Sequence, residues 1–158
     1  MFDRFRQIFS KPQVLTDEAK QFIKKLADSD IWILAIGLRG TPVISDINDP
    51  AAFEIIGAHR KDLSEIGDDD SVFPFNYERE GKQIFPFFDS EDSARHFLSN
   101  SGFLKVDISY FQPYRLGSGF VATPENDMFD LVLNPSCPSE RRITNEERLL
   151  LRSLTSPT

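Results

Sequence analysis

Four helices are predicted by apolar residues that recur every three or four positions behind a capping side chain. The predicted caps are Thr16, Asp49 (followed by Pro50), Ser90 and Thr144. Thr144 is followed three positions later by Glu147, the spacing of a capping box. The buried faces are expected to consist of Ala19, Phe22, Ile23 and Leu26; of Ala52, Ile55, Ile56, His59 and Leu63; of Ala94, Phe97 and Leu98; and of Leu149, Leu150 and Leu154.

Strands are predicted where apolar runs are short or alternate with polar residues. Residues 31–36 are apolar throughout and too few for a helix, which is typical of a strand buried on both faces. Residues 72–77 and 82–88 alternate, and residues 78–81 between them suit a short hairpin loop containing Gly81. Residues 42–47, 104–108 and 130–133 are further candidates. Residues 109–128 give no clear pattern, because Pro113, Gly117 and Gly119 interrupt them.

This order of elements predicts an α+β or mixed α/β fold. We expect a single mixed sheet of about five to six strands, with the hairpin at its centre and helices packed on it. The length of 158 residues is that of one domain. The predicted organisation is an amphipathic helix over residues 1–12, one domain over residues 13–154, and a disordered tail over residues 155–158.

The N-terminal segment places three phenylalanines, Phe2, Phe5 and Phe9, on one helical face, with basic residues around them. Such a helix either packs on the body of the domain or serves as a small interfacial anchor or partner-binding element. A strong membrane anchor needs a longer apolar face.

Charge and cysteine content exclude several classes of function. The net charge of −7 argues against nucleic-acid binding, which depends on Lys and Arg neutralising phosphates. A single cysteine excludes an intrachain disulfide framework and a cysteine-rich zinc module. The longest apolar run has six residues, whereas a membrane span needs about 20, and a secretory signal pattern is missing. We therefore expect a cytoplasmic protein that does not bind a membrane. The sequence does not decide whether it forms a homo-oligomer.

Candidate catalytic and metal-binding residues do not form a recognisable pattern. His59 and His96 are the only histidines, and Cys137 has no basic residue within three positions. The run Asp68, Asp69 and Asp70 lacks the spacing of a calcium loop. We predict no catalytic residues, no metal and no cofactor. An enzyme with a pocket near residues 109–128 is the alternative, using dispersed polar side chains such as Asp46, Asn48, Tyr110, Tyr114 and Arg115.

Three stretches carry a family resemblance: QIFPFFDSED at residues 83–92, LVLNPS at 131–136 and ITNEE at 143–147. In order and spacing they resemble the N-terminal domain of SseB-like (enhanced serine sensitivity) bacterial proteins. The resemblance covers roughly residues 15–154, and its specific part is residues 83–154. It implies no established activity, catalytic residue or cofactor. The family label has also been attached to type III secretion, partly because an unrelated protein shares the name.

The aromatic hairpin suggests a function. Apolar side chains occupy both of its faces, so one face is either covered by a helix or exposed as a binding surface. Residues 61–110 carry 5 basic and 11 acidic residues, a net charge of −6. We therefore predict a non-enzymatic domain that binds a protein, with a basic partner as the best match to the acid. The alternatives are a secretion-associated or membrane-peripheral protein using its N-terminal helix, and the enzyme named above. The predicted contact residues are Phe73, Phe75, Tyr77, Phe85, Phe87, Asp68, Asp69 and Asp70.

Overall fold

The computed structural model describes residues 14–44, 50–104, 108 and 110–156. Its α-helices are α2 (Asp17–Ala27), α3 (Pro50–His59), α4 (Glu91–Ser99) and α5 (Asn145–Thr155). Four short 3-10 helices accompany them: η1 (Leu63–Glu65), η2 (Ser101–Phe103), η3 (Ser118–Phe120) and η4 (Pro124–Asn126). The strands are β1 (Asp30–Leu38), β2 (Arg60–Lys61), β3 (Ser71–Pro74), β4 (Tyr77–Arg79), β5 (Lys82–Phe87), β6 (Gln112–Gly117), β7 (Asp130–Leu133) and β8 (Arg141–Arg142). The fold is mixed α and β, as predicted.

The strands of the described residues form two four-stranded sheets, so the prediction of a single sheet is wrong. In the first sheet β1 pairs antiparallel with β2, β3 and β6. The second has the order β4-β5-β7-β8, in which β5 and β7 are parallel and the other pairs antiparallel. The sheets separate because the segment after β3 leaves β1 and turns into the hairpin formed by β4 and β5.

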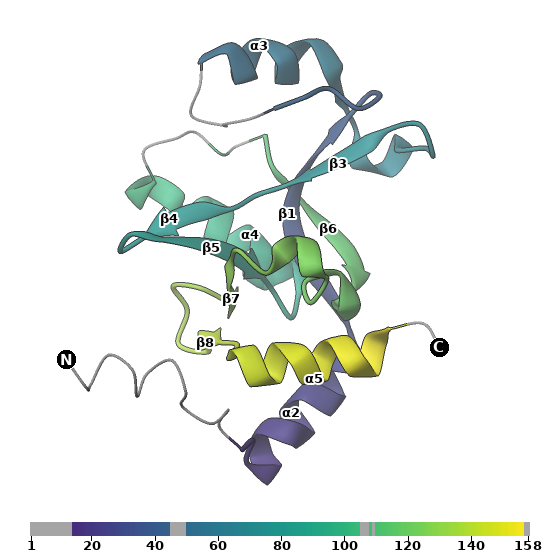
Figure 1. The fold of residues 1–158 in the computed structure, drawn as a ribbon. Helices are drawn as coiled ribbons and strands as arrows, with labels where there is room; N and C mark the ends of the chain where they lie inside the picture. Colours follow the sequence, from purple (N-terminus) through teal and green to yellow (C-terminus); the bar gives the residue numbers. More distant parts are fainter. Residues whose placement is uncertain (1–13, 45–49, 105–107, 109, 157–158) are drawn as a thin grey trace, which may run out of the picture.

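Strand β1 runs the length of the molecule and links the two sheets (Figure 1). At Trp32 it meets Phe88, the residue after β5, in an isolated antiparallel bridge. The Trp32 N–H donates to the Phe88 carbonyl at 2.9 Å, and the Phe88 N–H donates to the Trp32 carbonyl at 2.8 Å. The sheets are therefore joined by backbone hydrogen bonds at this one point, among the described residues.

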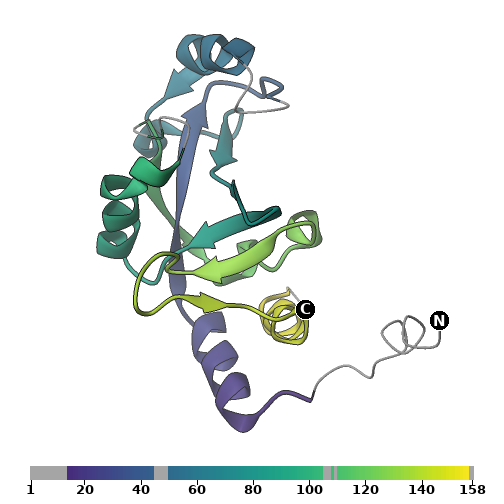
Figure 2. The ribbon, with the colours of Figure 1, turned by 90° about the vertical axis from the view of Figure 1, so that its left-hand side faces the viewer.

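Two hydrophobic cores lie on opposite sides of β1, because its side chains alternate between them. Ile31, Ile33 and Ala35 belong to the first core, with residues of α2 and α5. Leu34, Ile36 and Leu38 belong to the second core, with residues of α4. Figure 2 shows α4 on one side of β1 and strands β5, β7 and β8 on the other. The prediction that this strand is buried on both faces is confirmed.

The helix caps form as predicted wherever the capping residue is described. Thr16 and Ser90 accept hydrogen bonds from the N–H groups of Ala19 and Ser93. Thr144 accepts from the Glu147 N–H at 3.2 Å, while the Glu147 carboxylate accepts from the Thr144 N–H at 3.3 Å. Asp49, the fourth predicted cap, lies outside the described residues.

Several predicted boundaries differ from the structure. The strand expected over residues 72–77 is split between β3 in one sheet and β4 in the other. Residues 41–44 have no regular structure, and residues 45–47 lie outside the described part, as do residues 105–107 of another strand candidate. The unreadable segment contains β6, η3 and η4. Helix α5 includes Thr155, the first residue of the predicted disordered tail.

Helix α3 is less buried than its sequence pattern predicts. Only Ala52 and Ile56 are buried, His59 is exposed, and the helix ends before Leu63. The predicted N-terminal helix face of Phe2, Phe5 and Phe9 lies outside the described residues. None of the helices in the described residues is both long and apolar enough to span a membrane.

Candidate functional site

The aromatic hairpin is part of the hydrophobic core. Phe85 and Phe87, in β5, are 2% and 0% exposed and lie in the first core. Phe75 and Tyr77 are 4% and 6% exposed and lie in the second core. Phe73 is half-buried and packs against the second core. Of the two alternatives that the sequence left open, the structure shows the covered one, so the predicted contact residues Phe75, Tyr77, Phe85 and Phe87 are buried.

Ring contacts explain why so many aromatic residues occur in this region. The Phe75 ring stacks on Tyr77 with the centroids 5.7 Å apart, and it meets Phe111 edge to face at 5.0 Å. Phe97 of α4 packs against Phe88 at 5.6 Å. Helix α4 thus closes one face of the hairpin, while Phe85 and Phe87 lie in the core that includes residues of α2 and α5. These aromatic residues stabilise the fold and are not available to a partner.

The acidic run divides into one structural and two surface residues. The Asp70 carboxylate accepts hydrogen bonds from Lys61 Nζ at 2.6 Å, the Gly67 N–H at 3.0 Å and the Gly40 N–H at 3.2 Å. The hydrogen bond from Lys61, followed by those from the two backbone amides, lowers the pKa of Asp70 to about 2. Asp70 therefore fastens its loop to β2 and to the end of β1, whereas Asp68 and Asp69 are exposed.

Helix α3 lies at the end of the molecule remote from α2 and α5 (Figure 1), and it carries one exposed aromatic side chain, Phe53. Phe53 is 38% exposed, and its ring meets Tyr110 edge to face at 6.3 Å. The Arg60 guanidinium lies over the same Tyr110 ring, 5.7 Å from its centroid. We call Phe53, Arg60 and Tyr110 the α3 face. The sequence predicts the phenylalanines of the hairpin as contact residues, whereas the exposed phenylalanine of the α3 face, Phe53, is on a helix.

Sequence patterning missed the α3 face for an identifiable reason. Eight of the ten residues of α3 are Pro, Ala, Phe, Ile or Gly, so periodicity indicated an ordinary buried stripe. The structure buries only Ala52 and Ile56, which leaves Phe53 at the surface. A surface helix normally places polar residues on its outer side. The scarcity of polar residues on the outer side of α3 was therefore the sequence signal that could have indicated a binding surface there.

Negative charge is concentrated in α3 and in the segment that follows it. Residues 50–70 contain six acidic and two basic residues, a net charge of −4. Asp62, Glu65, Asp68 and Asp69 are all exposed. Hydrogen bonds from the Ser64 hydroxyl and the Ser64 N–H lower the pKa of Asp62, and the nearby charge of Arg60 acts in the same direction. These four carboxylates belong to the segment that follows Arg60 of the α3 face.

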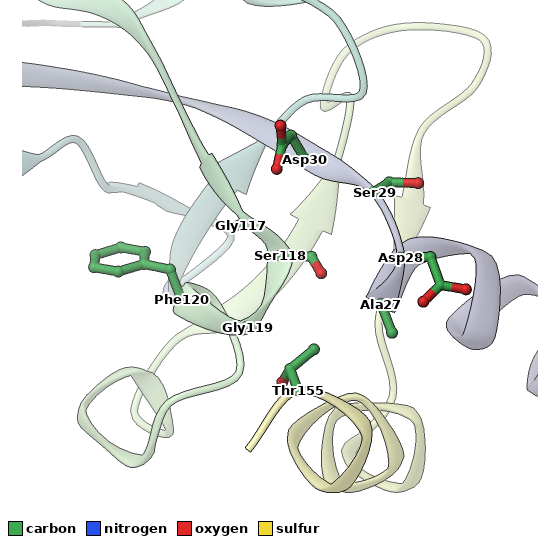
Figure 3. Close-up of a pocket in the computed structure, with 9 residues that line it drawn as sticks. All are labelled: Ala27, Asp28, Ser29, Asp30, Gly117, Ser118, Gly119, Phe120 and Thr155. Atoms are coloured by element: carbon green, nitrogen blue, oxygen red, sulfur yellow. The ribbon is translucent and has the colours of Figure 1, made fainter. Parts of the chain in front are cut away.

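A hollow lies in the segment for which an enzyme pocket was the alternative prediction. Gly117, Ser118, Gly119 and Phe120 form one wall, and the other walls come from the C-terminal ends of α2 and α5 (Figure 3). Tyr110, Tyr114 and Arg115 do not line it. Asp46 and Asn48 lie outside the described residues. Its lining contains Asp28 and Asp30 but no histidine, lysine or arginine beside a hydroxyl group.

The remaining candidates stay apart from one another in the described residues. His59 is exposed on α3 and His96 is exposed on α4, and Cys137 is half-buried in the loop after β7. Within the described part of the chain, no three His, Cys, Asp or Glu residues converge closely enough to hold a metal ion.

Asn134, in one of the motifs that carry the family resemblance, has a structural role. Its backbone is in the left-handed region, with φ of 48°. Its side chain accepts a hydrogen bond from the Asp89 N–H at 3.2 Å and donates to Ser139 Oγ at 3.2 Å. It therefore links the end of β7 to the start of α4.

Comparison with known proteins adds no assignment: no protein-family model, curated protein or solved structure matches this chain. The resemblance to SseB-like proteins therefore stays a prediction that rests on the quoted motifs.

Proposed function

We propose that this protein is a non-catalytic interaction domain, and that the α3 face binds a basic, amphipathic segment of a partner protein. The observation that carries this proposal is the exposure of Phe53 on a helix with an apolar outer side, inside a strongly acidic region. The sequence predicts an aromatic and acidic partner surface on the hairpin, and we propose that this surface is instead on α3.

The residue types on the α3 face are those that dominate binding energies at interfaces. Aromatic residues and arginine are enriched among residues whose truncation costs more than about 1 kcal/mol of binding free energy. Phe53 and Arg60 both contact Tyr110, which holds them in place before a partner arrives. Little side-chain entropy is then lost on binding.

Charge complementarity defines the partner. Asp62, Glu65, Asp68 and Asp69 are exposed in the segment that follows Arg60, so a partner segment with apolar anchors flanked by lysine or arginine fits best. The hydrogen bonds of Asp70 with Lys61, Gly67 and Gly40 hold this acidic segment against β2 and the end of β1. Acidic surroundings also accelerate the encounter with a basic partner, and salt weakens that effect.

A synthetic amphipathic peptide of leucine and lysine is a suitable probe, measured by fluorescence anisotropy against the full chain. Phe53→Ala is expected to weaken binding at least about tenfold, which corresponds to 1.4 kcal/mol. Leu149→Ala is the matched control, because Leu149 is an apolar residue of α5 that is 58% exposed. The control is expected to change binding less than about twofold.

Charge variants test the same surface without altering its packing. Asp68→Asn with Asp69→Asn should weaken binding and reduce its salt dependence, whereas Glu78→Gln with Glu125→Gln, at exposed positions outside this region, should do neither. Equal loss in both pairs would show attraction to net charge alone and would refute the α3 face. Unchanged binding by a folded Phe53→Ala variant would refute it as well. A photo-crosslinker at position 53 then identifies the natural partner, which should carry a basic segment at the crosslink.

A further inference from the structure

The hollow beside Ser118 is built from three chain segments that are distant in sequence. It has a volume of about 370 Å³ and lies where α2 ends, where α5 ends and where β6 passes into η3. Figure 3 shows the side chains of Ala27, Ser118 and Thr155 around its centre. A space of this size is at the small end of the range for ligand pockets, about 300–1,000 Å³.

Ser118 is a buried polar residue without a partner. It is 1% exposed, and its hydroxyl has no hydrogen bond in the structure. Its Oγ points into the space that faces Ala27 and Thr155 (Figure 3). Buried hydroxyl groups are nearly always hydrogen-bonded, because leaving one unpaired is costly. An unpaired hydroxyl aimed into a hollow therefore indicates that a ligand atom completes it.

The other hydroxyl groups of the lining are already satisfied. Ser29 Oγ donates to the Lys25 carbonyl at 2.7 Å, and Thr155 Oγ1 donates to the Leu151 carbonyl at 2.7 Å. Gly119 lies so close to Thr155 that an added Cβ would be 2.9 Å from its side chain. The wall is thus closely packed where Gly119 meets Thr155, and Ser118 has the hydroxyl left for a ligand.

The charge of the lining selects a cation. Two carboxylates, Asp28 and Asp30, line the hollow, and no Lys, Arg or His does. Asp30 is paired with Arg115 at 2.7 Å, whereas Asp28 has no hydrogen bond or ion pair to another side chain in the described part of the chain. The C-terminal ends of α2 and α5 add negative electrostatic potential, because helix dipoles point that way.

The lining favours an organic cation over a metal ion. Acidic metal sites need several converging oxygen ligands, and the described residues contain no group of three candidate ligands close enough together. The methyl groups of Ala27 and Thr155 beside the free hydroxyl suit a short apolar chain.

From these observations we infer that the hollow binds a small primary ammonium compound. The ammonium group donates hydrogen bonds to Ser118 Oγ and to the Asp28 carboxylate, and its short carbon chain lies against Ala27 and Thr155. This site is separate from the α3 face and does not depend on the proposed function.

The experiment is a titration of the full chain with n-butylamine at neutral pH and constant ionic strength, followed by amide chemical shifts in NMR spectra. Saturable shifts are expected at Ser29, Gly117, Gly119 and Thr155, in the millimolar range of concentration. The neutral analogue 1-butanol and the anion butyrate have the same chain and are expected to cause no saturable shifts there.

Two conservative variants distinguish the site from general attraction to an acidic protein. Ser118→Ala and Asp28→Asn should each weaken binding at least about tenfold. Glu78→Gln, which removes an exposed carboxylate belonging to neither site, should leave binding unchanged. Thermal unfolding of Ser118→Ala shows whether the fold is intact; loss of an unpaired hydroxyl is not expected to destabilise it.

Three outcomes would overturn the inference. The first is binding by folded Ser118→Ala and Asp28→Asn variants that equals that of the unaltered protein. The second is equal binding of 1-butanol, which would show an apolar slot without charge selection. The third is a set of shifts spread over the acidic surface and equally reduced by Glu78→Gln.

Discussion

Replacing Phe87 by alanine tests whether the aromatic hairpin is core or surface. Phe87 is 0% exposed and lies in the first core, on a strand that pairs in parallel with β7. Truncating a buried phenylalanine to alanine costs about 3–5 kcal/mol, from lost burial and from the cavity left behind. We therefore expect Phe87→Ala to remain folded with its free energy of unfolding lowered by about that amount.

Adding Phe75→Ala turns this loss into unfolding. Phe75 is 4% exposed and lies in the second core, so the two truncations affect different clusters and their costs should add. The sum of about 6–10 kcal/mol is comparable with the entire stability of a typical domain, about 5–15 kcal/mol. We expect the double variant to be largely unfolded, and any loss of partner binding to follow from that.

Urea titration provides the measurement, with two probes. Trp32 is the single tryptophan, and it lies at the bridge between the two sheets, so its fluorescence reports on their separation. Far-UV circular dichroism follows the helices. Leu149→Ala, at a position that is 58% exposed, is the control and should change the stability by less than about 0.5 kcal/mol.

A loss of less than about 1 kcal/mol in Phe87→Ala would refute the reasoning. So would a double variant that unfolds cooperatively with nearly unchanged stability. Either result would mean that these side chains are not buried in solution, and the hairpin would again be the leading candidate for the partner surface.

Three further predictions concern the region near α3. Gly37→Ala should lower the free energy of unfolding by about 1–3 kcal/mol, because its Cβ would collide with the Lys61 carbonyl and lie 2.8 Å from Ile66 Cδ1. Gly57→Ala, with open space at its Cβ, should instead stabilise α3; thermal unfolding of both variants is the measurement. Asp70→Asn should be less stable than the unaltered protein at pH 7, and the difference should shrink as the pH falls. The pKa of Asp70 is depressed from 3.8 to about 2, so its contribution is present above about pH 4 and is lost between about pH 4 and 2. Urea midpoints at several pH values measure this, and a difference independent of pH would contradict it.

Elements defined by contacts within a few residues were predictable from the sequence. The caps at Thr16, Ser90 and Thr144 bond to an N–H three positions later, so the signal and its partner lie in one short segment. The strand at residues 130–133 and the two-sided burial of β1 were predictable for a similar reason. A run of apolar residues of strand length states by itself that both faces are covered.

Elements that depend on distant pairing were not predictable. Strand β6 was not predictable because Pro113 and Gly117 interrupt its sequence pattern. It forms because it pairs with β1, about 80 residues earlier, and because a proline is tolerated at a sheet edge. The segment after β3 changes sheets near Phe75, whose N–H donates to the Leu34 carbonyl at 2.8 Å. Alternation in residues 72–77 cannot show this change, because the side chains keep the same period in both sheets.

The candidate sites were decided by tertiary structure alone. The sequence determined that aromatic and acidic residues are concentrated in the middle of the chain, but not which of them are covered. Packing by α4 on one side and by the first core on the other buries Phe75 and Phe87, whereas Phe53 stays exposed. The hollow beside Ser118 exists only because the ends of α2 and α5 meet the turn after β6. At Phe53, Phe75 and Phe87, exposure depends on what distant parts of the chain cover, and the local sequence pattern of these segments does not determine it.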